Sequence, residues 1–261
     1  MSNLRTPLNQ EKINSELLHS YWRVSVVDVT GSTQNDLANS VRASNSQHGD
    51  VLVSEYQSSG RGRLDRTFEA PPLSALLFSF FIEPQIDAAD LSWIPLIAGL
   101  SVVGAIDSCC NITLNKRVML KWPNDILIGE KKIAGLISEH VDKRGVVVGI
   151  GINVGMNESE LPVDHASSLE IEGCHGCDRD ALLVAILTEF TSLLNRLERG
   201  DKALRDEYAA RCATINSAVR VEHPAGDFTE SVAIAIDASG ALVLADGKHV
   251  NVGDVIHLQR R

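Results

Sequence analysis

Three arginines lie among glycines in the segment from Glu55 to Phe80, EYQSSGRGRLDRTFEAPPLSALLFSF, which then enters an apolar run. Glycine allows the backbone to approach a ligand closely or to adopt positive φ, and arginine supplies planar donors suited to carboxylate and phosphate. The residues concerned are Gly60, Gly62, Arg61, Arg63 and Arg66. This loop fits a small anionic molecule, although a lone GRGR segment is more typical of a solvated basic turn.

A second candidate segment is KWPNDILIGEKKIAG, which sets Lys121, Lys131 and Lys132 near Asn124 and Asp125. A carboxylate beside an amide at a turn can hold Mg²⁺ through water or orient an amine. The alternative is that Pro-Asn-Asp only forms a hairpin turn, with the tryptophan in the core and the lysines in solvent.

The third segment is GIGINV, residues 149–154. Its glycines superficially resemble a dinucleotide-binding fingerprint, but the strand continues through them instead of opening a helix, so an NAD site is not expected. Glycine inside a strand more often marks close approach of a ligand. Asn153 at the strand's end is a candidate contact to a base or a ribose.

Helix and strand signals alternate over the first two hundred residues, and these elements must position the three segments. Strands are expected at residues 22–29, 51–55, 74–82, 131–141 and 145–154, with two short strands around a turn at 118–128. Helices are expected at residues 32–43, 89–110, 181–198 and 202–212. Alternation of this kind predicts an α/β or α+β domain built on one mixed sheet.

The composition changes after Cys212, where short β segments are separated by closely spaced turn signals. We expect a small β barrel or sandwich there, too short to be an enzyme by itself. The predicted domains are therefore residues 1–213 and residues 214–261.

The formal net charge of -10 over 261 residues argues against nucleic acid and anionic membrane as partners. No apolar run approaches the roughly 20 residues that cross a bilayer, and the polar start does not resemble a signal peptide. About twenty residues precede the first strand, too few for a three-helix DNA-binding module. A cytoplasmic protein without such a module is expected.

The five cysteines are odd in number and lack the spacing of a disulfide framework, which suits a reducing compartment. Cys109, Cys110 and Cys212 are interpreted as small buried or half-buried hydrophobic residues. Cys174 and Cys177 have the CxxC spacing, but a zinc site normally needs a second pair or suitable histidines. Incidental loop cysteines are the favoured interpretation.

Taken together, in this order, the segments resemble those of the biotin protein ligases, also called biotin-[acetyl-CoA-carboxylase] ligases. The resemblance covers nearly the whole chain and rests on GSTQNDLA, EYQSSGRGRLDR, KWPNDILIGEKKIAGLISE, VGIGINV and the closing GDVIHL. It implies an α+β fold, with a mixed sheet flanked by helices as in class II synthetases and a C-terminal SH3-like β-barrel. It also implies the monofunctional type, without an N-terminal DNA-binding domain.

The resemblance implies that biotin reacts with MgATP to give biotinyl-5′-AMP, after which biotin passes to one lysine of a biotin carboxyl carrier protein or domain. The cofactors implied are ATP and Mg²⁺, with biotin as substrate, and a homodimer is possible. Three alternatives are a lipoate or octanoate ligase, a biotin-responsive repressor and a non-catalytic biotin-binding protein.

The same resemblance implies roles for individual residues. Those implied to contact biotin are Ser32, Thr33, Gln57, Gly60, Arg61, Lys132, Gly135 and Gly149. Those implied to contact ATP or the adenylate are Arg63, Arg66, Phe68, Asn124, Lys132 and Asn153. The implied catalytic residues are Arg63, Arg66, Lys132 and Asp125, with Asn124 and Asp125 as candidate Mg²⁺ ligands. The arginine loop would order over the adenylate and shield it from water.

The sequence departs from the family pattern at four positions. Gln34 replaces an asparagine, Asp65 a glycine, Phe68 a tryptophan and Leu73 a glycine. These departures bear on the tightness of the lid over the adenylate more than on the reaction.

Overall fold

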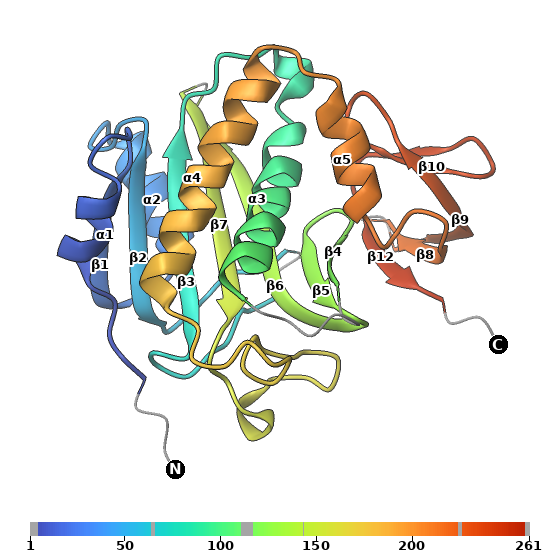
Figure 1. Ribbon diagram of the computed structural model, residues 1–261. Helices are drawn as coiled ribbons and strands as arrows, with labels where there is room; N and C mark the ends of the chain where they lie inside the picture. Colours follow the sequence, from blue (N-terminus) through green and yellow to red (C-terminus); the bar gives the residue numbers. More distant parts are fainter. Residues whose placement is uncertain (1–4, 64–65, 111–116, 143, 224–225, 259–261) are drawn as a thin grey trace.

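A seven-stranded mixed sheet forms the centre of the computed structural model, which describes residues 5–63, 66–110, 117–142, 144–223 and 226–258. Its strands, in the order β1-β2-β3-β7-β6-β5-β4, are β1 (Arg23–Thr30), β2 (Asp50–Gln57), β3 (Ala75–Ile82), β7 (Gly145–Asn153), β6 (Lys131–Val141), β5 (Asp125–Ile128) and β4 (Val118–Lys121). Only β1 and β2 run parallel, joined by a crossover helix, and the other neighbours are antiparallel. The predicted mixed sheet is confirmed (Figure 1).

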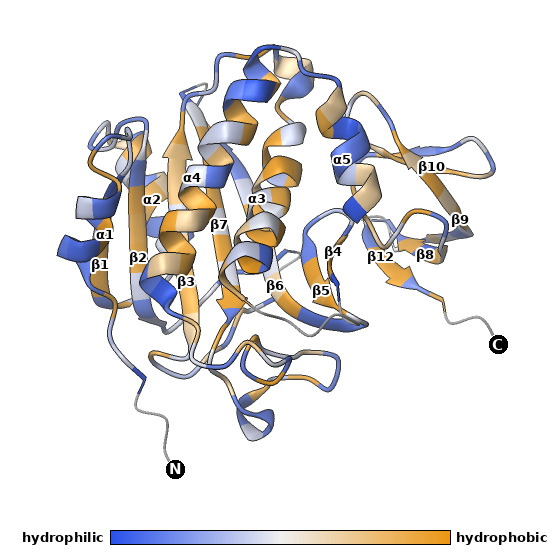
Figure 2. Cartoon of the chain, viewed as in Figure 1, coloured by the Kyte–Doolittle hydropathy of each residue, from blue (hydrophilic) through white to orange (hydrophobic). Residues whose placement is uncertain are grey.

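Helices cover both faces of this sheet. They are α1 (Gln10–Glu16), α2 (Thr33–Arg42), α3 (Trp93–Cys109), α4 (Arg179–Glu198) and α5 (Ala203–Arg211). α3 and α4 lie side by side over one face, whereas α2 packs on the other through Leu37, Ala38 and Val41. Apolar and polar residues alternate around α4, whereas α3 is apolar over most of its surface (Figure 2). None of the described helices is long and apolar enough to cross a membrane.

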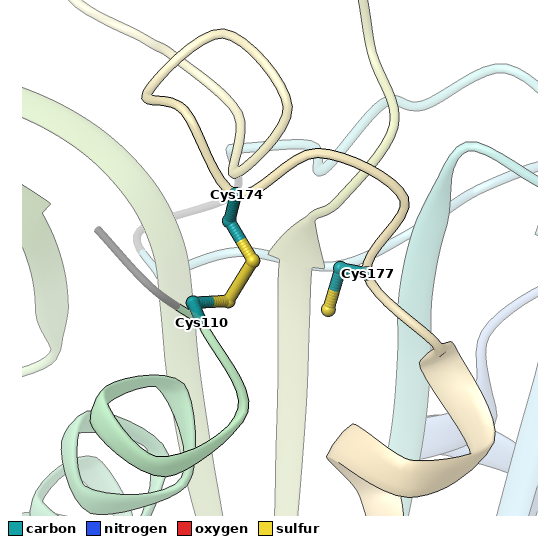
Figure 3. A group of neighbouring side chains, drawn as sticks. All are labelled: Cys110, Cys174 and Cys177. Carbon is teal, nitrogen blue, oxygen red and sulfur yellow. A yellow bond between two sulfur atoms is a disulfide. The ribbon is translucent and has the colours of Figure 1, made fainter. Parts of the chain in front are cut away.

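A long connection joins β7 to α4 and corrects the interpretation of the cysteines. Cys110, at the end of α3, forms a disulfide with Cys174 in this connection (Figure 3). These two residues are therefore not merely a buried hydrophobe and an incidental loop cysteine, and Cys109 is exposed. Spacing could not indicate this pair, because the fold brings together residues 64 positions apart. Cys212 is buried, as expected.

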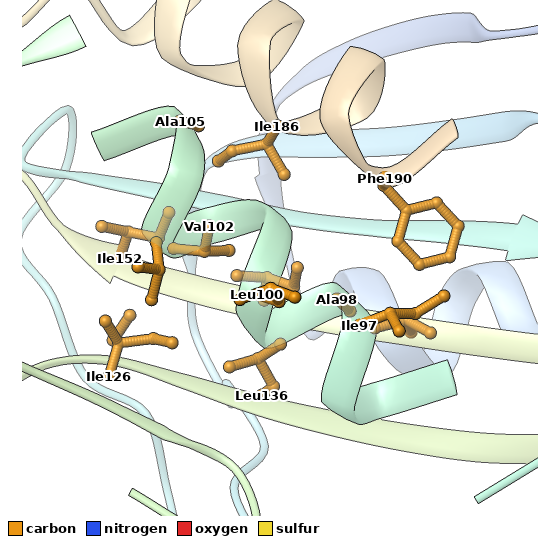
Figure 4. Close-up of a cluster of buried hydrophobic side chains, with 14 of the residues drawn as sticks. Ile97, Ala98, Leu100, Val102, Ala105, Ile126, Leu136, Ile152, Ile186 and Phe190 are labelled. Carbon is orange, nitrogen blue, oxygen red and sulfur yellow. The ribbon is translucent and has the colours of Figure 1, made fainter. Parts of the chain in front are cut away.

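The main core lies between the sheet and the α3–α4 layer. Ile97 and Val102 of α3 pack with Ile152 of β7 and with Ile186 and Phe190 of α4 (Figure 4). α3 is apolar nearly all round because the sheet lies on one side of it and α4 on another. Gly99 lets this helix lie close to β4, since an added Cβ would lie 2.8 Å from Leu120 Cδ2 and would require that side chain to shift.

Helix α1 was not expected from the sequence. The Asn9 side chain accepts a hydrogen bond from the Lys12 backbone N–H and caps the helix, and Ile13 is fully buried. Ile13 and Leu17 lie on one face and join the main core. An N-cap followed by two apolar residues four positions apart was the available signal.

The C-terminal segment forms a second, five-stranded antiparallel sheet in the order β11-β10-β9-β8-β12. The strands are β8 (Ala218–Glu222), β9 (Phe228–Ile236), β10 (Leu242–Leu244), β11 (His249–Val250) and β12 (Asp254–His257). Two indole N–H groups reach this part of the chain: Trp93 donates to the Ala238 carbonyl and Trp122 to that of Gly240. The small β unit is confirmed, whereas its closure into a barrel stays a prediction.

Candidate functional site

The glycine- and arginine-rich segment from Gly60 to Phe68 is called the Arg/Gly loop below. A cavity of about 1430 Å³ lies where the central sheet, the Arg/Gly loop and the C-terminal sheet meet. Its walls come from the start of α2, the β4–β5 hairpin, residues 162–166 and the final strand β12. Thirteen of the predicted site residues line it, namely Ser32, Thr33, Gln57, Arg61, Arg63, Arg66, Phe68, Asn124, Asp125, Lys132, Gly135, Gly149 and Asn153. Gly60 is the predicted residue that does not.

Glycines leave the sheet open beneath this cavity. Gly149 pairs with Ser79 of β3, and Gly151, two residues on, pairs with Gly135 of β6, so the three glycines share one face. An added Cβ on Gly149 would lie 2.6 Å from Gln34 Oε1 and 3.1 Å from Ser79 Oγ. Side chains on this strip would fill the space that a ligand needs.

Polar groups gather at one end of the cavity, where α2 begins. Thr33 Oγ1 contacts Ser79 Oγ at 2.9 Å, and the Thr33 backbone N–H donates to Gln57 Oε1 at 2.7 Å. Ser32 is the N-cap of α2, yet its Oγ makes no capping bond. Ser32 Oγ and Gln34 Oε1 are buried side-chain atoms for which the described residues provide no hydrogen-bond partner. Such atoms are costly unless a ligand satisfies them.

The Arg/Gly loop folds back on itself. Gly60 accepts a hydrogen bond from the Phe68 N–H, and Gly62 donates to the Arg66 carbonyl. An added Cβ on Gly60 would lie 2.3 Å from the Phe68 carbonyl oxygen, so only glycine fits this closure. The Arg61 side chain reaches α2, where its Nη1 donates a hydrogen bond to Asn35 Oδ1.

The other two arginines converge on the C-terminal sheet. Arg66 forms an ion pair with Asp254 of β12, and Arg63 Nη1 lies 4.0 Å from the same carboxylate. Arg63 also donates to Asn124 Oδ1 and to the Gly253 carbonyl. Burial lowers the pKa of Arg63, whereas Asp254 and Asp125 raise it. Asp254 therefore provides the negative charge that these cations face.

Phe68 and Leu73 are two of the four departures from the family pattern. The Phe68 ring covers Gly151, where an added Cβ would lie 2.8 Å from the ring atoms. Leu73 has a φ of 64°, a conformation that favours glycine. Gln34 lies at the cavity's polar end, and Asp65 lies outside the described residues.

Lys132 and Asp125 form the charged centre of the cavity, with Lys132 Nζ 2.6 Å from Asp125 Oδ1. A β-bulge decides this geometry, because the register shifts so that Leu127 pairs with Lys132 and Ile126 with Ala134. Ile133 is the extra residue and joins Ala134 in the core. The bulge turns Lys132 to the face that carries Asp125 and Gly135.

The two predicted asparagines are held by the backbone. Asn124 Nδ2 donates to the Leu136 carbonyl, and the Asn124 carbonyl accepts from the Leu136 N–H. Asn153 Nδ2 donates to the Ser167 carbonyl, which fixes a buried side chain at the end of β7. The side-chain oxygen of Asn124 already accepts from Arg63, so this amide braces the loop and the hairpin against each other.

Sequence reasoning assigned no role to Ser79, Gly151 and Asp254 of the cavity wall, and it noted Lys121 only as part of the basic segment around Asn124 and Asp125. Lys121 lies at the end of β4, where burial, together with Lys132 and Arg66, lowers its pKa and Asp125 and Asp254 raise it. Lys121, directly before Trp122, and Gly151, the second glycine of GIGINV, could have been selected as site residues from the sequence. Nothing in the sequence indicated that Asp254 approaches Arg63, because the two residues are far apart along the chain.

The arrangement suits a molecule with two unlike ends. One end of the cavity offers the buried oxygens Ser32 Oγ and Gln34 Oε1 beside the strip of three glycines. The other end offers the cations Arg63, Arg66 and Lys132. A planar polar group fits the first end, and a carboxylate or phosphate fits the second.

Family models match two parts of the chain. Residues 26–157 match the biotin/lipoate A/B protein ligase family, and residues 214–258 match the biotin protein ligase C-terminal domain. The first match includes the Arg/Gly loop, Lys132 and the glycine strip, and the second includes Asp254. The fold and the site thus define a member of the ligases that attach a cofactor acid to protein.

Individual relatives specify the class further. The biotin–[acetyl-CoA-carboxylase] ligase of Mycobacterium tuberculosis is 33% identical over 98% of this chain and 98% of its own length. The bifunctional ligase/repressor BirA of Bacillus spizizenii is 28% identical over 93% of this chain and 73% of its own. Biotin protein ligase from Aquifex aeolicus, in complex with biotin and ATP, has a TM-score of 0.77 and 26% identity, covering 91% of this chain and 99% of its own. The chain belongs to the biotin protein ligase family.

Proposed function

We propose that this chain joins biotin to AMP, using MgATP, and then transfers the biotinyl group to a lysine of a biotin carboxyl carrier protein or domain. The observation that carries the proposal is the two-ended cavity, which sets Ser32, Thr33 and Gln57 at one end and Lys132, Arg63 and Arg66 at the other. Biotin itself has this form, with a planar ureido group and a carboxylate on a short chain.

The ureido group would occupy the polar end. Ser32 Oγ and Gln34 Oε1 are available to its N–H groups. The Thr33 hydroxyl, which donates to Gln57 Oε1 and contacts Ser79 Oγ, would turn from Gln57 to donate to the ureido carbonyl oxygen. Gly135 and Gly149 would leave room for the ring and the tail. We propose that Arg61 contributes through its backbone, and that Gly60, which lies outside the cavity wall, contributes by closing the loop against Phe68.

Adenylation would take place at the cationic end. A biotin carboxylate oxygen attacks the α-phosphorus of ATP, the bond to the bridging oxygen breaks, and pyrophosphate leaves with that electron pair. Negative charge builds on the phosphoryl oxygens during this step, where Lys132 and the two arginines can stabilise it. Asp125 holds Lys132 in position until the ligand's anionic groups compete for it.

Mg²⁺ fits this donor set in part. The ion prefers one or two carboxylates together with substrate phosphates. Asp125 provides a carboxylate at the cationic end, whereas the side-chain oxygen of Asn124 is already used by Arg63. Asp125 would therefore hold the ion, with Asn124 nearby, and the ion would neutralise phosphate charge.

Transfer requires the acceptor lysine to lose a proton, since its ordinary pKa is near 10.4. Asp125 is our candidate to receive this proton. After adenylation Lys132 would bind the phosphate of the biotinyl adenylate, which would free the Asp125 carboxylate from its pair with Lys132. Asn153 would contact the adenine, and Phe68 would cover the adenylate from its place over Gly151. Water exclusion by Phe68 and the Arg/Gly loop would protect the mixed anhydride.

We place the domain division at residues 213 and 214, which the start of the C-terminal family match at residue 214 supports. We propose that the catalytic sheet is of the class II synthetase type and that the C-terminal sheet curls into an SH3-like barrel. We also propose that the chain forms a homodimer.

The proposal is tested by determining which acid the chain attaches to a carrier domain. The chain is incubated with ATP, Mg²⁺ and a biotin carboxyl carrier domain in the presence of biotin, lipoate or octanoate, and the carrier is weighed by mass spectrometry. Addition of one biotinyl group, with no lipoyl or octanoyl product, is expected. Preferred transfer of lipoate or octanoate would support that alternative, and biotin binding without transfer would support a non-catalytic protein.

A further inference from the structure

Three cysteine sulfurs meet where α3 ends and α4 begins. Cys110 is the C-cap of α3, Cys174 lies in the connection above it, and Cys177 directly precedes the N-cap of α4, as Figure 3 shows. Their Sγ atoms all lie within 4.8 Å of one another. Since Cys110 and Cys174 form a disulfide, Cys177 is a third sulfur beside a complete pair.

This cluster is separate from the ligase site. None of the three cysteines lines the cavity described above, and no step of the proposed reaction uses a thiol. A structural disulfide needs two sulfurs, so the position of Cys177 is not explained by the cross-link.

We propose that the reduced form of this cluster binds one soft metal ion of the zinc class through Cys110, Cys174 and Cys177. Thiolates select such ions, and tetrahedral Zn–S bonds of about 2.3 Å place sulfurs about 3.8 Å apart. The present separations lie within 4.8 Å, so small side-chain rotations would suffice. The three ligands come from two segments that the fold already holds together.

The CxxC turn is shaped for this arrangement. Gly173 and Gly176 have φ values of 99° and 65°, which favour glycine, and the Cys174 N–H donates to the Leu169 carbonyl. Glu170 accepts from the Gly176 N–H and contacts His175 Nδ1 at 3.0 Å. The histidine is thereby held at the surface, away from the sulfurs, with its side chain 75% exposed.

Metal binding and the disulfide exclude each other. A dithiol reductant would supply two electrons and two protons, break the Cys110–Cys174 bond and become a disulfide itself. Zn²⁺ would then displace one proton from each of the three thiols and form three Zn–S bonds. Water would fill the fourth position, because the exposed Cys109 lies outside the group of three sulfurs.

Zn²⁺ titration of the full chain tests this proposal. The chain is reduced with a phosphine and desalted without oxygen, and Zn²⁺ binding is followed by native mass spectrometry and by competition with a chromogenic chelator. One Zn²⁺ per reduced chain is expected, and none at this site in the oxidised chain. Co²⁺ in place of Zn²⁺ should give thiolate-to-metal charge-transfer absorption.

Substitutions identify the ligands. Cys177→Ser leaves the disulfide pair intact and should weaken Zn²⁺ binding at least about 100-fold, since even loss of an outer-shell partner costs roughly 10–100-fold. Cys109→Ser is the matched control and should bind as the wild type does. Cys177→Ala and Cys174→Ser serve as second variants, with circular dichroism to verify folding. A reduced chain that binds no Zn²⁺, equal affinity after Cys177→Ser, or a comparable loss after Cys109→Ser overturns the proposal.

Discussion

Lys132 and its neighbour Lys131 are chemically alike, but the β-bulge at Ile133 places only Lys132 beside Asp125. Lys131 instead contacts the Asp164 carbonyl at the surface. We expect Lys132→Gln to slow biotin-dependent adenylation by about 10²–10³-fold, the range found when one preorganised charge-stabilising donor is lost. Lys131→Gln should retain activity. Equal losses in pyrophosphate-release assays of the two variants would contradict this account.

Gly149 can be tested in the same way. Gly149→Ala would bring a Cβ to 2.6 Å from Gln34 Oε1, at the proposed ureido end, so we expect weaker biotin binding by about 10-fold or more. Gly104→Ala is the control, because its Cβ would make an ordinary 3.5 Å contact in α3 and should stabilise the helix by about 0.5–1 kcal/mol. Calorimetric titration with biotin measures the biotin affinity of both variants, and thermal unfolding measures the stability of Gly104→Ala. Unchanged affinity in Gly149→Ala would mean that biotin lies elsewhere.

The sequence was informative about residues that belong to compact motifs. Lys132, Asp125, Gly135 and Gly149 were selected from two segments, and the structure brings them to one face of the sheet. Asp254 was not selected, although it belongs to the closing GDVIHL segment, because nothing in that segment indicates the distant arginines that it meets. Contacts between distant segments depend on the assembled fold and leave no local pattern.

At the scale of elements, the Arg/Gly loop is latched to β12 by Asp254. This carboxylate occupies the place beside Arg63 and Arg66 that we assign to ligand anions, and only 12% of its side chain is exposed. Asp254→Asn should release the loop, so we expect cleavage by trypsin after its arginines to become about 5–10-fold faster without ligand. That factor corresponds to roughly 1–1.4 kcal/mol for a partly buried ion pair.

The control for the latch is Glu230→Gln, which breaks the exposed Arg220–Glu230 pair in the same C-terminal sheet. Its loop should be cleaved at the wild-type rate. Unaltered cleavage in Asp254→Asn would show that the latch does not restrain the loop.

Long periodic elements could be predicted from the sequence, whereas short ones could not. The buried helix α3 and strands β3, β6 and β7 lie where their apolar patterns indicated. Helix α1 has only seven residues and one buried side chain within its bounds, and its place is decided by packing against β1 and α4. The Cys110–Cys174 pair was missed for the same reason, since the meeting of α3 with a distant loop is a tertiary event.

At the scale of the whole molecule, acid should destabilise the fold partly through His48. Its Nδ1 accepts a hydrogen bond from the Glu83 N–H, and burial lowers its pKa, whereas Glu83 and Glu198 raise it and Arg23 lowers it. Between the ordinary pKa of about 6.5 and the lower pKa of His48 in the folded chain, the unfolded chain binds more protons at this residue than the folded chain. The free energy of unfolding therefore falls as pH falls, by at most about 1.4 kcal/mol per pH unit from this group.

Urea unfolding between about pH 7.5 and 5.5 checks this sign. His48→Gln should flatten the pH dependence, and His19→Gln, at an exposed residue, should follow the wild type. A steeper loss of stability in His48→Gln than in the wild type would contradict the assignment.

The central claim is that one cavity binds biotin and ATP together and lets the biotin carboxylate attack the α-phosphorus. The most direct measurement is pyrophosphate release from ATP and Mg²⁺ by the wild-type chain without any carrier, with and without biotin. We expect release that requires biotin, stops near one equivalent per chain and leaves biotinyl-5′-AMP bound. Release independent of biotin, or no release while biotin binds, would contradict the account.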